Sequence, residues 1–209
     1  MNVHDPSTPT LRRVGILVFD DVEVLDFAGP FEVFAVTAEL AGQQHFRTVL
    51  VGKEDRVFTA VNGLKVLPNE TFADGHAYDL LVVPGGFGTR ALVHDADVMA
   101  WVTAQAATAE IVMSVCSGAL VLATCGLLEG RRATTHHEVM HELAAIAPRT
   151  VCVGDERYVD EGAVITCGGI SAGIDGSLHV VRRLLGEAAA ARTAAYMEYH
   201  WTNDNGVRR

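Results

Sequence analysis

The segment Ile111–Gly126, IVMSVCSGALVLATCG, places a cysteine where a β-branched run stops and a helix-forming run starts. Ser117 and Gly118 follow Cys116 directly, so the backbone can turn sharply there. The free N–H groups at the start of a helix favour a thiolate over a thiol. Hydrolases display their nucleophile on such a strand-to-helix turn, although position 114 is serine here where that motif has glycine. We interpret Cys116 as a candidate nucleophile; the alternative is an ordinary cysteine at a strand end.

A candidate acid-base residue occurs in the segment VEVLDFAGPFEVF. Asp26 lies among apolar residues, just before a helix that we expect to begin at Gly29 and Pro30. A carboxyl group in an apolar setting can hold or deliver a proton near neutral pH. Gly29 is better placed than Asp26 to cap that helix, and Glu23 is the competing carboxylate.

Two glycines end another apolar run, in VVPGGFG. The N–H groups of Gly85 and Gly86 can approach a ligand closely because no side chain obstructs them, so we expect them to stabilise charge on a reacting substrate. The alternative is a turn that requires glycine. Phe87, which follows, is expected to line the substrate pocket.

Three histidines follow in TTHHEVMHEL. His136 is interpreted either as a helix cap or as a residue lining the site, and His141 as a surface residue of an amphipathic helix. A cysteine-histidine pair would indicate hydrolysis of peptides or amides, which requires the fold to bring His136 or His137 near Cys116.

The elements that position these residues alternate between short apolar strands and helices. Because the strands are apolar on both faces, the pattern predicts a mostly parallel sheet covered by helices on both sides, with ligands bound at the carboxyl ends of the strands. We expect one domain at 12–202, between a flexible tail at 1–11 and a C-terminal tail at 203–209. We expect strands at 14–19, 46–52, 78–86, 109–115 and in the two arms of 157–169. We expect helices at 29–40, 95–106, 117–125 and 137–148, and further helices from residue 173 to the end of the domain. The dipeptide Asn62-Gly63 predicts a hairpin within 57–68.

Composition limits the function classes. The 209 residues are 49% hydrophobic and carry a formal charge of −10, which argues against nucleic acid and anionic membranes as partners. No apolar leader or membrane span is evident, so we expect a soluble, cytoplasmic protein. The four cysteines show no CxxC spacing, so we expect reduced thiols and no metal site, with Cys125, Cys152 and Cys167 as small buried hydrophobes.

Four segments together resemble the ThiJ/PfpI superfamily: LDFAGPFEVF, VVPGGFG, SVCSGALVLATCGLLEGRRATTHHE and GGISAGIDGSLHVV. The resemblance extends from Val14 to about Tyr199. It implies the class I glutamine amidotransferase-like fold, a flavodoxin-like three-layer α/β sandwich with a nucleophile elbow. Within the superfamily the motifs look most like isocyanide hydratases and the amidase-like sensor domains of AraC-type transcription regulators.

The resemblance also implies roles for individual residues. Cys116 matches the superfamily nucleophile, Asp26 the acidic residue paired with it in isocyanide hydratases, and Ser117 a threonine that follows the cysteine there. Gly85 and Gly86 match oxyanion-type donors. A homodimer and a reaction without cofactor are implied as well.

Our leading interpretation is an isocyanide hydratase-like enzyme that acts on a small carbon–nitrogen substrate. Ser117 stands where the protease branch has histidine, which argues against protease or deglycase activity, and Ala28 replaces a threonine of the hydratase motif. The alternatives are a non-catalytic small-molecule sensor or stress-related binding protein, and a glyoxalase-like enzyme acting on 2-oxoaldehydes. A DNA-binding regulator would need a helix-turn-helix domain after MEYHWTNDNGVRR, and a glutaminase would need a triad that His137-Glu138 does not supply.

Overall fold

The computed structural model describes residues 11–202, and its centre is a seven-stranded sheet in the order β10-β11-β7-β6-β1-β2-β5. All neighbouring strands are parallel except β10, which is antiparallel to β11. The expected tails lie outside the described residues, apart from Leu11. The strands of this sheet are β1 (Arg12–Val18), β2 (Phe46–Gly52), β5 (Glu70–Thr71), β6 (Leu80–Val83), β7 (Ile111–Val115), β10 (Tyr158–Asp160) and β11 (Val164–Cys167).

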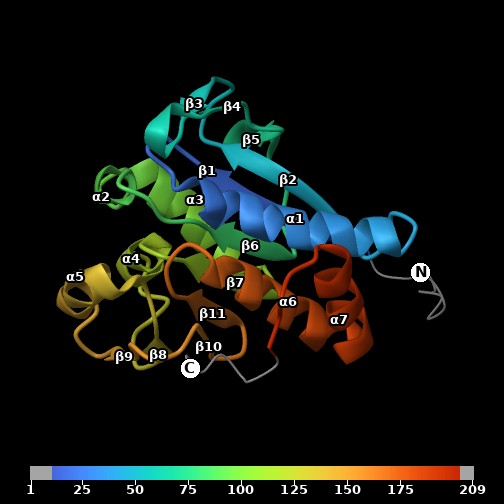
Figure 1. The fold of residues 1–209 in the computed structure, drawn as a ribbon. Helices are drawn as coiled ribbons and strands as arrows, with labels where there is room; N and C mark the ends of the chain where they lie inside the picture. Colours follow the sequence, from blue (N-terminus) through green and yellow to red (C-terminus); the bar gives the residue numbers. More distant parts are fainter. Residues whose placement is uncertain (1–10, 203–209) are drawn as a thin grey trace, which may run out of the picture.

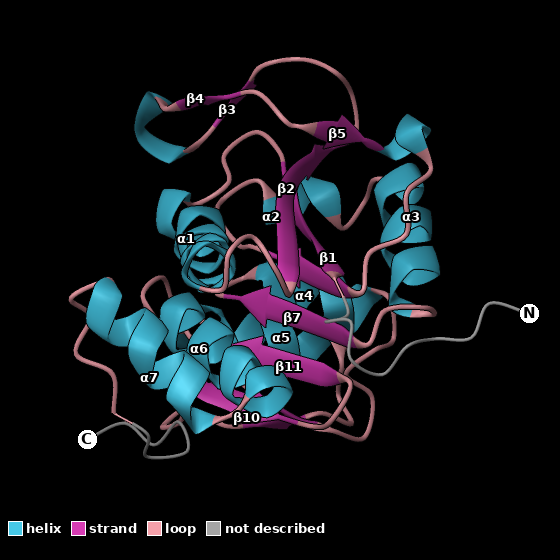
Figure 2. Cartoon of the chain, turned by 90° about the vertical axis from the view of Figure 1, so that its right-hand side faces the viewer, coloured by secondary structure: helices cyan, strands magenta, loops and turns pink. Residues whose placement is uncertain are grey.

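Helices cover both faces of this sheet, as the sequence predicts (Figures 1 and 2). Helices α1, α6 and α7 contact one another on one face, while α3 lies on the other side and α4 contacts both α2 and α5. The helices are α1 (Val24–Leu40), α2 (Thr89–Leu92), α3 (Ala96–Ala106), α4 (Gly118–Thr124), α5 (Met140–Ile146), α6 (Ala172–Leu185) and α7 (Glu187–Tyr196). This is the expected flavodoxin-like α/β sandwich. None of the helices between residues 11 and 202 is long and apolar enough to cross a bilayer.

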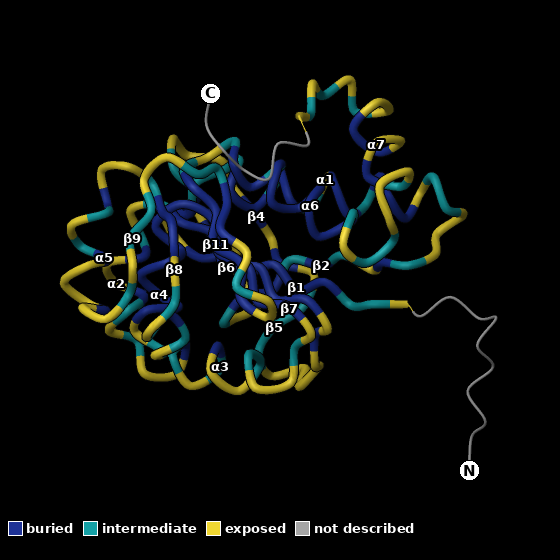
Figure 3. Tube along the Cα trace, turned by 90° about the horizontal axis from the view of Figure 1, so that it is seen from below, coloured by how far each residue is buried: buried dark blue, intermediate teal, exposed yellow. Residues whose placement is uncertain are grey.

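The central strands form the core because their side chains are apolar on both faces. Every residue of β6, β7 and β11 is buried, and Figure 3 shows these strands running through the interior of the molecule. Helix α4 is buried along nearly its whole length, consistent with its apolar sequence. Asp95 caps α3, since its side chain accepts hydrogen bonds from the N–H groups of Asp97 and Val98. A rigid, dry core therefore supports the loops at the strand ends.

Helix α1 begins earlier than predicted, at Val24 rather than at Gly29. Pro30 consequently lies inside the helix and not in its first turn, where its fixed φ would be most favourable. The prediction read Pro30 as a helix start because proline lacks the N–H that an interior position requires. The structure instead places Asp26 within the first turn of α1.

Short elements were predicted less well. The hairpin exists, as β3 (Phe58–Thr59) paired with β4 (Lys65–Val66), but its connection contains the 3₁₀ helix η1 (Val61–Gly63) and is longer than a two-residue turn. Asn62 and Gly63 both adopt positive φ, 63° and 89°, as that dipeptide favours. The helix predicted at 137–148 is divided into the 3₁₀ helix η3 (His137–Val139) and α5. The sequence did not reveal β5, α2, β8 (Arg132–Ala133), β9 (Val151–Cys152) or the 3₁₀ helix η2 (Phe72–Asp74).

Some burial predictions need correction. Ile146, the last residue of α5, is 40% exposed. Cys167 is fully buried, whereas Cys125 and Cys152 are only half-buried. All four cysteines are free thiols.

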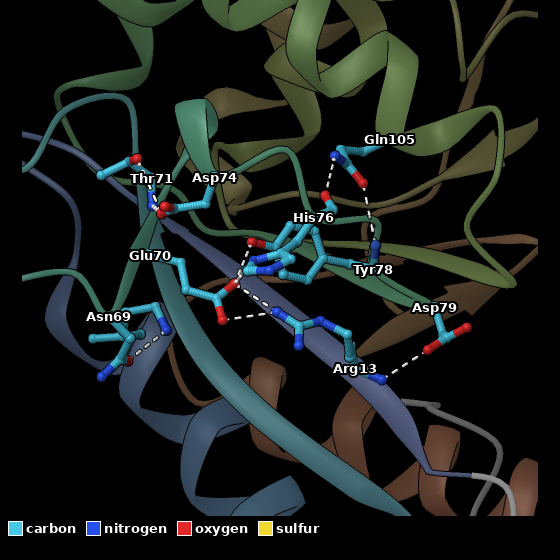
Figure 4. Close-up of polar contacts among 10 residues, drawn as sticks. Arg13, Asn69, Glu70, Thr71, Asp74, His76, Tyr78, Asp79 and Gln105 are labelled. Atoms are coloured by element: carbon cyan, nitrogen blue, oxygen red, sulfur yellow. Dashed lines mark hydrogen bonds and ion pairs between the residues drawn. The ribbon is translucent and has the colours of Figure 1, made fainter.

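A polar cluster anchors β5 to the sheet edge (Figure 4). Glu70 accepts hydrogen bonds from the Arg13 guanidinium at 2.7 and 2.8 Å and from the Tyr78 hydroxyl at 2.8 Å, and it also contacts His76. These partners lower the pKa of the Glu70 carboxyl against the opposing effect of burial. The cluster keeps the short β5 strand in register at the edge of the sheet far from Cys116.

Candidate active site

Three neighbouring strands bring Asp26, Gly85 and Cys116 to one edge of the sheet. The order β7-β6-β1 puts the carboxyl ends of these parallel strands side by side. Asp26 follows β1, Gly85 follows β6, and Cys116 follows β7 directly. The segment between β6 and α2, residues 84–88, is called the β6 loop below. The Glu23 N–H donates a hydrogen bond to the Gly85 carbonyl at 2.9 Å, which attaches the start of α1 to this loop. Residues distant in the sequence thus meet where ligands bind in α/β folds.

Cys116 occupies a strained turn between β7 and α4. Its φ is +55°, a left-handed conformation that few residues other than glycine adopt. The Cys116 N–H donates to the carbonyls of Cys167 and Gly168 at 3.2 and 2.9 Å, and the buried Thr135 hydroxyl donates to the Cys116 carbonyl at 2.7 Å. These bonds hold the peptide on both sides of the cysteine in the expected nucleophile elbow.

Glycine is required on the approach to this elbow. A Cβ on Gly118 would lie 2.1 Å from the Val83 carbonyl oxygen, and one on Gly85 would lie 2.9 Å from Cys116 Cβ. The start of α4 and the β6 loop therefore pack so closely that positions 85 and 118 have no room for a side chain.

Asp26 lies against this elbow and is completely inaccessible to solvent. Its Oδ2 accepts a hydrogen bond from the Gly85 N–H at 2.9 Å, while its Oδ1 is buried without a hydrogen-bond partner among the described residues. Burial raises the pKa of Asp26 to about 7; the Gly85 N–H opposes this shift, the Glu23 carboxylate adds to it, and the neighbouring Cys116 thiol opposes it. Asp26 can therefore exchange a proton near neutral pH.

The ionisation of Cys116 differs from the prediction. Burial, reinforced by the Asp26 carboxylate, raises the pKa of the thiol to about 12, even though the main-chain N–H groups of Ser117 and Ile170 act in the opposite direction. The side chain is buried, at 8% exposure, so the cost of desolvating a thiolate exceeds the benefit from the start of a seven-residue helix. The resting group is a thiol, and its proton must move to an acceptor before sulfur can attack.

The expected oxyanion donors are already engaged. The Gly85 N–H binds Asp26, and the Gly86 N–H donates to Ser117 Oγ at 3.0 Å. Both amides thus have partners in this conformation, and their role as donors to a reacting substrate stays a prediction. Ser117, which follows Cys116 in the sequence, is among the residues that line the cavity described below.

A cavity of about 190 Å³ opens beside the Cys116 sulfur. Its volume suits a small molecule rather than a peptide. Phe87 lines it while remaining 73% exposed, and His136 both lines it and caps η3, with Nδ1 accepting from the Glu138 N–H at 3.3 Å. The two interpretations of His136 are thus compatible. The cavity is lined by Glu23, Gly86, Phe87, Arg90, Cys116, Ser117, His136, Glu138, Val139 and Ile170.

The two candidate carboxylates differ in their access to the cavity. Glu23 lines it, whereas Asp26 lies behind Cys116 and does not. His137 and His141 are exposed and do not line it. Between residues 11 and 202, no group of three or more His, Cys, Asp or Glu side chains is arranged to hold a metal ion.

Several residues of this site, among them Arg90 and Val139 of the cavity wall, are not evident from the sequence. Ile170 lines the cavity with a φ of +49°, which is exceptional for a β-branched residue, and it directs its N–H at the Cys116 sulfur. Thr135 supports the elbow, and Thr89 contacts Ser117. No local pattern marks these residues, because each acts through a contact between segments distant in the sequence.

Comparison with known proteins agrees with this geometry. Residues 12–183 match the model of the DJ-1/PfpI family. The chain is 38% identical over 190 residues to an isonitrile hydratase from Pseudomonas putida, a match that covers 90% of this chain and 78% of the relative.

Regulators also resemble the chain. It is 26% identical over 203 residues to the HTH-type transcriptional regulator GbdR from Pseudomonas aeruginosa, covering 95% of this chain and 55% of the regulator, so it spans about half of that protein. A solved structure of a THiJ/PfpI family protein from Pseudomonas syringae superimposes with a TM-score of 0.82 at 28% identity, covering 98% of this chain and 84% of that one.

Proposed function

Because the chain belongs to the DJ-1/PfpI family, we propose that it is a cysteine-dependent enzyme that hydrates a small isocyanide to an N-substituted formamide, without a cofactor. The observation that carries the proposal is the buried pair of Cys116 and Asp26, in which Asp26 titrates near neutrality beside a protonated thiol. The similarity to an isonitrile hydratase supports the choice of substrate class.

In the first half of the reaction, the Asp26 carboxylate accepts the Cys116 proton as sulfur attacks the terminal isocyanide carbon. A carbon–sulfur bond forms, and Asp26 returns the proton to that carbon, directly or through a water molecule. The product is a thioimidate, in which the S–H bond has been added across the isocyanide carbon. A pKa near 7 suits Asp26 to both the acceptance and the return of the proton.

In the second half, water adds to the thioimidate carbon while Asp26 takes one of its protons. The carbon–nitrogen π electrons move to nitrogen, which receives the proton that Asp26 took from water. The tetrahedral adduct then expels the Cys116 sulfur as the proton of its hydroxyl group passes to that sulfur. The N-substituted formamide leaves and the thiol recovers its proton, so the net change is addition of one water to the isocyanide. The Ser117 hydroxyl, beside the sulfur, stabilises charge on the adduct.

The cavity matches a small substrate with an apolar substituent. Phe87, Val139 and Ile170 provide apolar walls, and the volume of about 190 Å³ admits a short alkyl or aryl group. The test is incubation of the purified, reduced protein with a panel of alkyl and aryl isocyanides, with formamide detected by NMR. Cys116→Ala should show no formamide above the uncatalysed rate, since no other group can form the thioimidate.

A ligand sensor is the second candidate, favoured by the similarity to regulators such as GbdR. In that case wild type forms no formamide from any isocyanide, and Asp26→Asn changes only ligand affinity. A glyoxalase-like reaction would also use a thiol and a carboxylate, so 2-oxoaldehydes belong in the same assay. Conversion of a 2-oxoaldehyde without conversion of isocyanides would replace the proposed substrate class.

We also propose that the protein is a homodimer, as the family resemblance implies. Light scattering at micromolar concentration should give the mass of two chains. A mass of one chain would reject this proposal without bearing on the chemistry.

A further inference from the structure

The cavity beside Cys116 contains a carboxylate that lacks a partner within the described chain. Glu23 is the N-cap residue of α1, yet its side chain makes no capping hydrogen bond to the start of that helix. Between residues 11 and 202 it also has no ion pair and no side-chain hydrogen bond. Glu23 is partly buried and lines the cavity. Because a charge that is partly removed from water is costly without a counter-charge, a positively charged ligand would be stabilised here.

The charge of Glu23 acts on both groups of the proposed reaction. It adds to the rise in the pKa of the Asp26 carboxyl and to the rise in the pKa of the Cys116 thiol. The interaction between two charges weakens with distance and is screened by water, so Glu23 lies close to the reacting atoms. A cationic group on a molecule bound at Cys116 would therefore be within range of this carboxylate.

The basic side chains of the cavity do not neutralise Glu23. Arg90 forms an ion pair with Glu142 at 2.7 Å, so these two side chains together add no net charge. His136 accepts a hydrogen bond from the Glu138 N–H at Nδ1, and an imidazole nitrogen that accepts carries no proton, so the ring is neutral in this arrangement. Glu138 lines the cavity too, but its side chain is 78% exposed and its charge is screened by water. The cavity therefore carries an excess of negative charge, which comes chiefly from Glu23.

The apolar part of the lining favours a cation that has an apolar surface. Phe87 is 73% exposed, so its ring is open to a ligand, and the face of an aromatic ring attracts a cation. Val139 and Ile170 add aliphatic surface, which offers no hydrogen bonds to replace the water around a primary ammonium ion. A quaternary ammonium group has methyl groups that suit these walls and a charge that suits Glu23.

We propose that Glu23 makes this site select small molecules that carry a cationic group, above all a quaternary ammonium group, a short distance from the atom that Cys116 attacks. The inference rests on the proposed function for the isocyanide group of the substrate. It does not rest on that function for the selection of charge, which applies to any reagent that reaches the sulfur. Glu23 is thus a specificity-determining residue and takes no part in the proton transfers assigned to Asp26.

The first test measures charge selection at Cys116 without an isocyanide. The two reagents are 2-(trimethylammonio)ethyl methanethiosulfonate and its neutral isostere 3,3-dimethylbutyl methanethiosulfonate, in which carbon replaces the charged nitrogen. With each reagent, the Cys116 thiol loses its proton to the buffer, its sulfur forms a disulfide with the alkylthio group, and methanesulfinate leaves. Mass spectrometry of the Cys116 peptide gives each rate, which is divided by the rate of the same reagent with 2-mercaptoethanol. The cationic-to-neutral ratio of these corrected rates is called the charge selectivity.

Wild type should show a charge selectivity of about 5, and Glu23→Gln should lower it to about 1. Since Glu23 also raises the Cys116 pKa, Glu23→Gln should accelerate both reagents, and the ratio removes this common effect. Glu32→Gln is the matched control, because Glu32 is exposed on α1 and does not line the cavity. It changes the net charge of the chain equally and should leave the charge selectivity unaltered.

Two outcomes of this test would overturn the proposal. A charge selectivity of about 1 in wild type would do so without any variant. An equal loss of charge selectivity in Glu23→Gln and Glu32→Gln would assign the effect to the net charge of the whole chain and not to Glu23.

The second test applies the same comparison to turnover, with 2-(trimethylammonio)ethyl isocyanide and 3,3-dimethylbutyl isocyanide as the isosteric pair. In wild type, KM should be about 5-fold lower for the cation while kcat is similar, because Glu23 contacts the substituent equally before and during the reaction. Glu23→Gln should remove this difference in KM. An equal KM for the two isocyanides in wild type would reject Glu23 as a determinant of substrate choice.

The two proposals can fail separately in these experiments. If wild type hydrates neither isocyanide but its Cys116 shows the expected charge selectivity, the proposed function fails and the selection of cations stands. If wild type hydrates both isocyanides with equal KM and shows no charge selectivity toward the methanethiosulfonates, the proposed function stands and the role of Glu23 is rejected.

Discussion

The main-chain N–H of Gly85 donates a hydrogen bond of 2.9 Å to Asp26 Oδ2, and these residues are 59 positions apart in the sequence. The bond orients one carboxylate oxygen and leaves the other, Oδ1, buried without a partner among the described residues. An ionised carboxylate is costly in this setting, so the carboxyl holds a proton until near neutral pH. Gly85 thus limits the rise in the Asp26 pKa that burial causes, while Gly86 and Phe87 of the same loop line the cavity.

Asp26 should control the pH dependence of turnover. Its carboxylate form accepts the thiol proton, so kcat/KM should rise with pH through an apparent pKa near 7. Asp26→Asn should lower turnover by roughly 10²–10⁴-fold and remove this rise. The measurement is kcat/KM between pH 5 and 9.

Glu23→Gln is the matched control for that experiment, because Glu23 is the carboxylate that lines the cavity. It should retain the rise near pH 7. If Glu23→Gln loses the rise while Asp26→Asn keeps it, the acid-base roles of the two carboxylates must be exchanged.

Asp26 should also make folding stability depend on pH. Its folded-state pKa is raised from 3.8 to about 7, so the native state binds the proton more tightly than the unfolded state. This contribution to stability is present below pH about 4 and is lost as the pH rises through about 7, by a few kcal/mol in total, roughly 1.4 kcal/mol for each pKa unit. Asparagine does not bind this proton. The melting temperature of Asp26→Asn minus that of wild type should therefore be larger at pH 8 than at pH 4. An unchanged difference between the two pH values would show that Asp26 titrates normally.

Thiol alkylation should respond to Asp26 in the opposite direction from turnover. The Asp26 carboxylate raises the Cys116 pKa, so its removal in Asp26→Asn should increase the thiolate fraction and accelerate iodoacetamide alkylation at pH 8. Mass spectrometry of Cys116 peptides measures the rate, with Cys152, which is half-buried and separate from the site, as internal reference. Slower alkylation of Cys116 in Asp26→Asn would mean that the carboxylate promotes the thiolate instead.

Gly85→Ala should disrupt the elbow. The added Cβ would lie 2.5 Å from the Ser117 nitrogen and 2.9 Å from Cys116 Cβ, so the backbone must shift. We expect a loss of about 1–3 kcal/mol in unfolding free energy and a large loss of turnover. Gly154→Ala is the control, because its Cβ would meet only the Met140 methyl group at 3.9 Å. Chemical denaturation of both variants gives the comparison, and equal stabilities would contradict the close packing described for Gly85.

The sequence by itself determined the sheet and the elbow. Runs such as Ile111–Val115 are apolar on both faces, which commits them to buried parallel strands. The strand, Cys116, Ser117 and Gly118 follow one another in the sequence, so the local pattern sufficed to identify the turn. Asp26 was identified in the same way, from a carboxyl group in an apolar segment, and the family motifs agree with the fold.

Only the tertiary structure decided what these groups do to one another. Three kinds of contact join segments that the sequence leaves far apart: the Glu23 N–H with the Gly85 carbonyl, the Gly85 and Gly86 amides with Asp26 and Ser117, and Thr89 with Ser117. Ionisation is the clearest case: the start of a helix beside Cys116 predicted a thiolate, whereas burial and the Asp26 charge favour the thiol. A pKa depends on desolvation and on every nearby charge, and both quantities exist only once the chain has folded around the group.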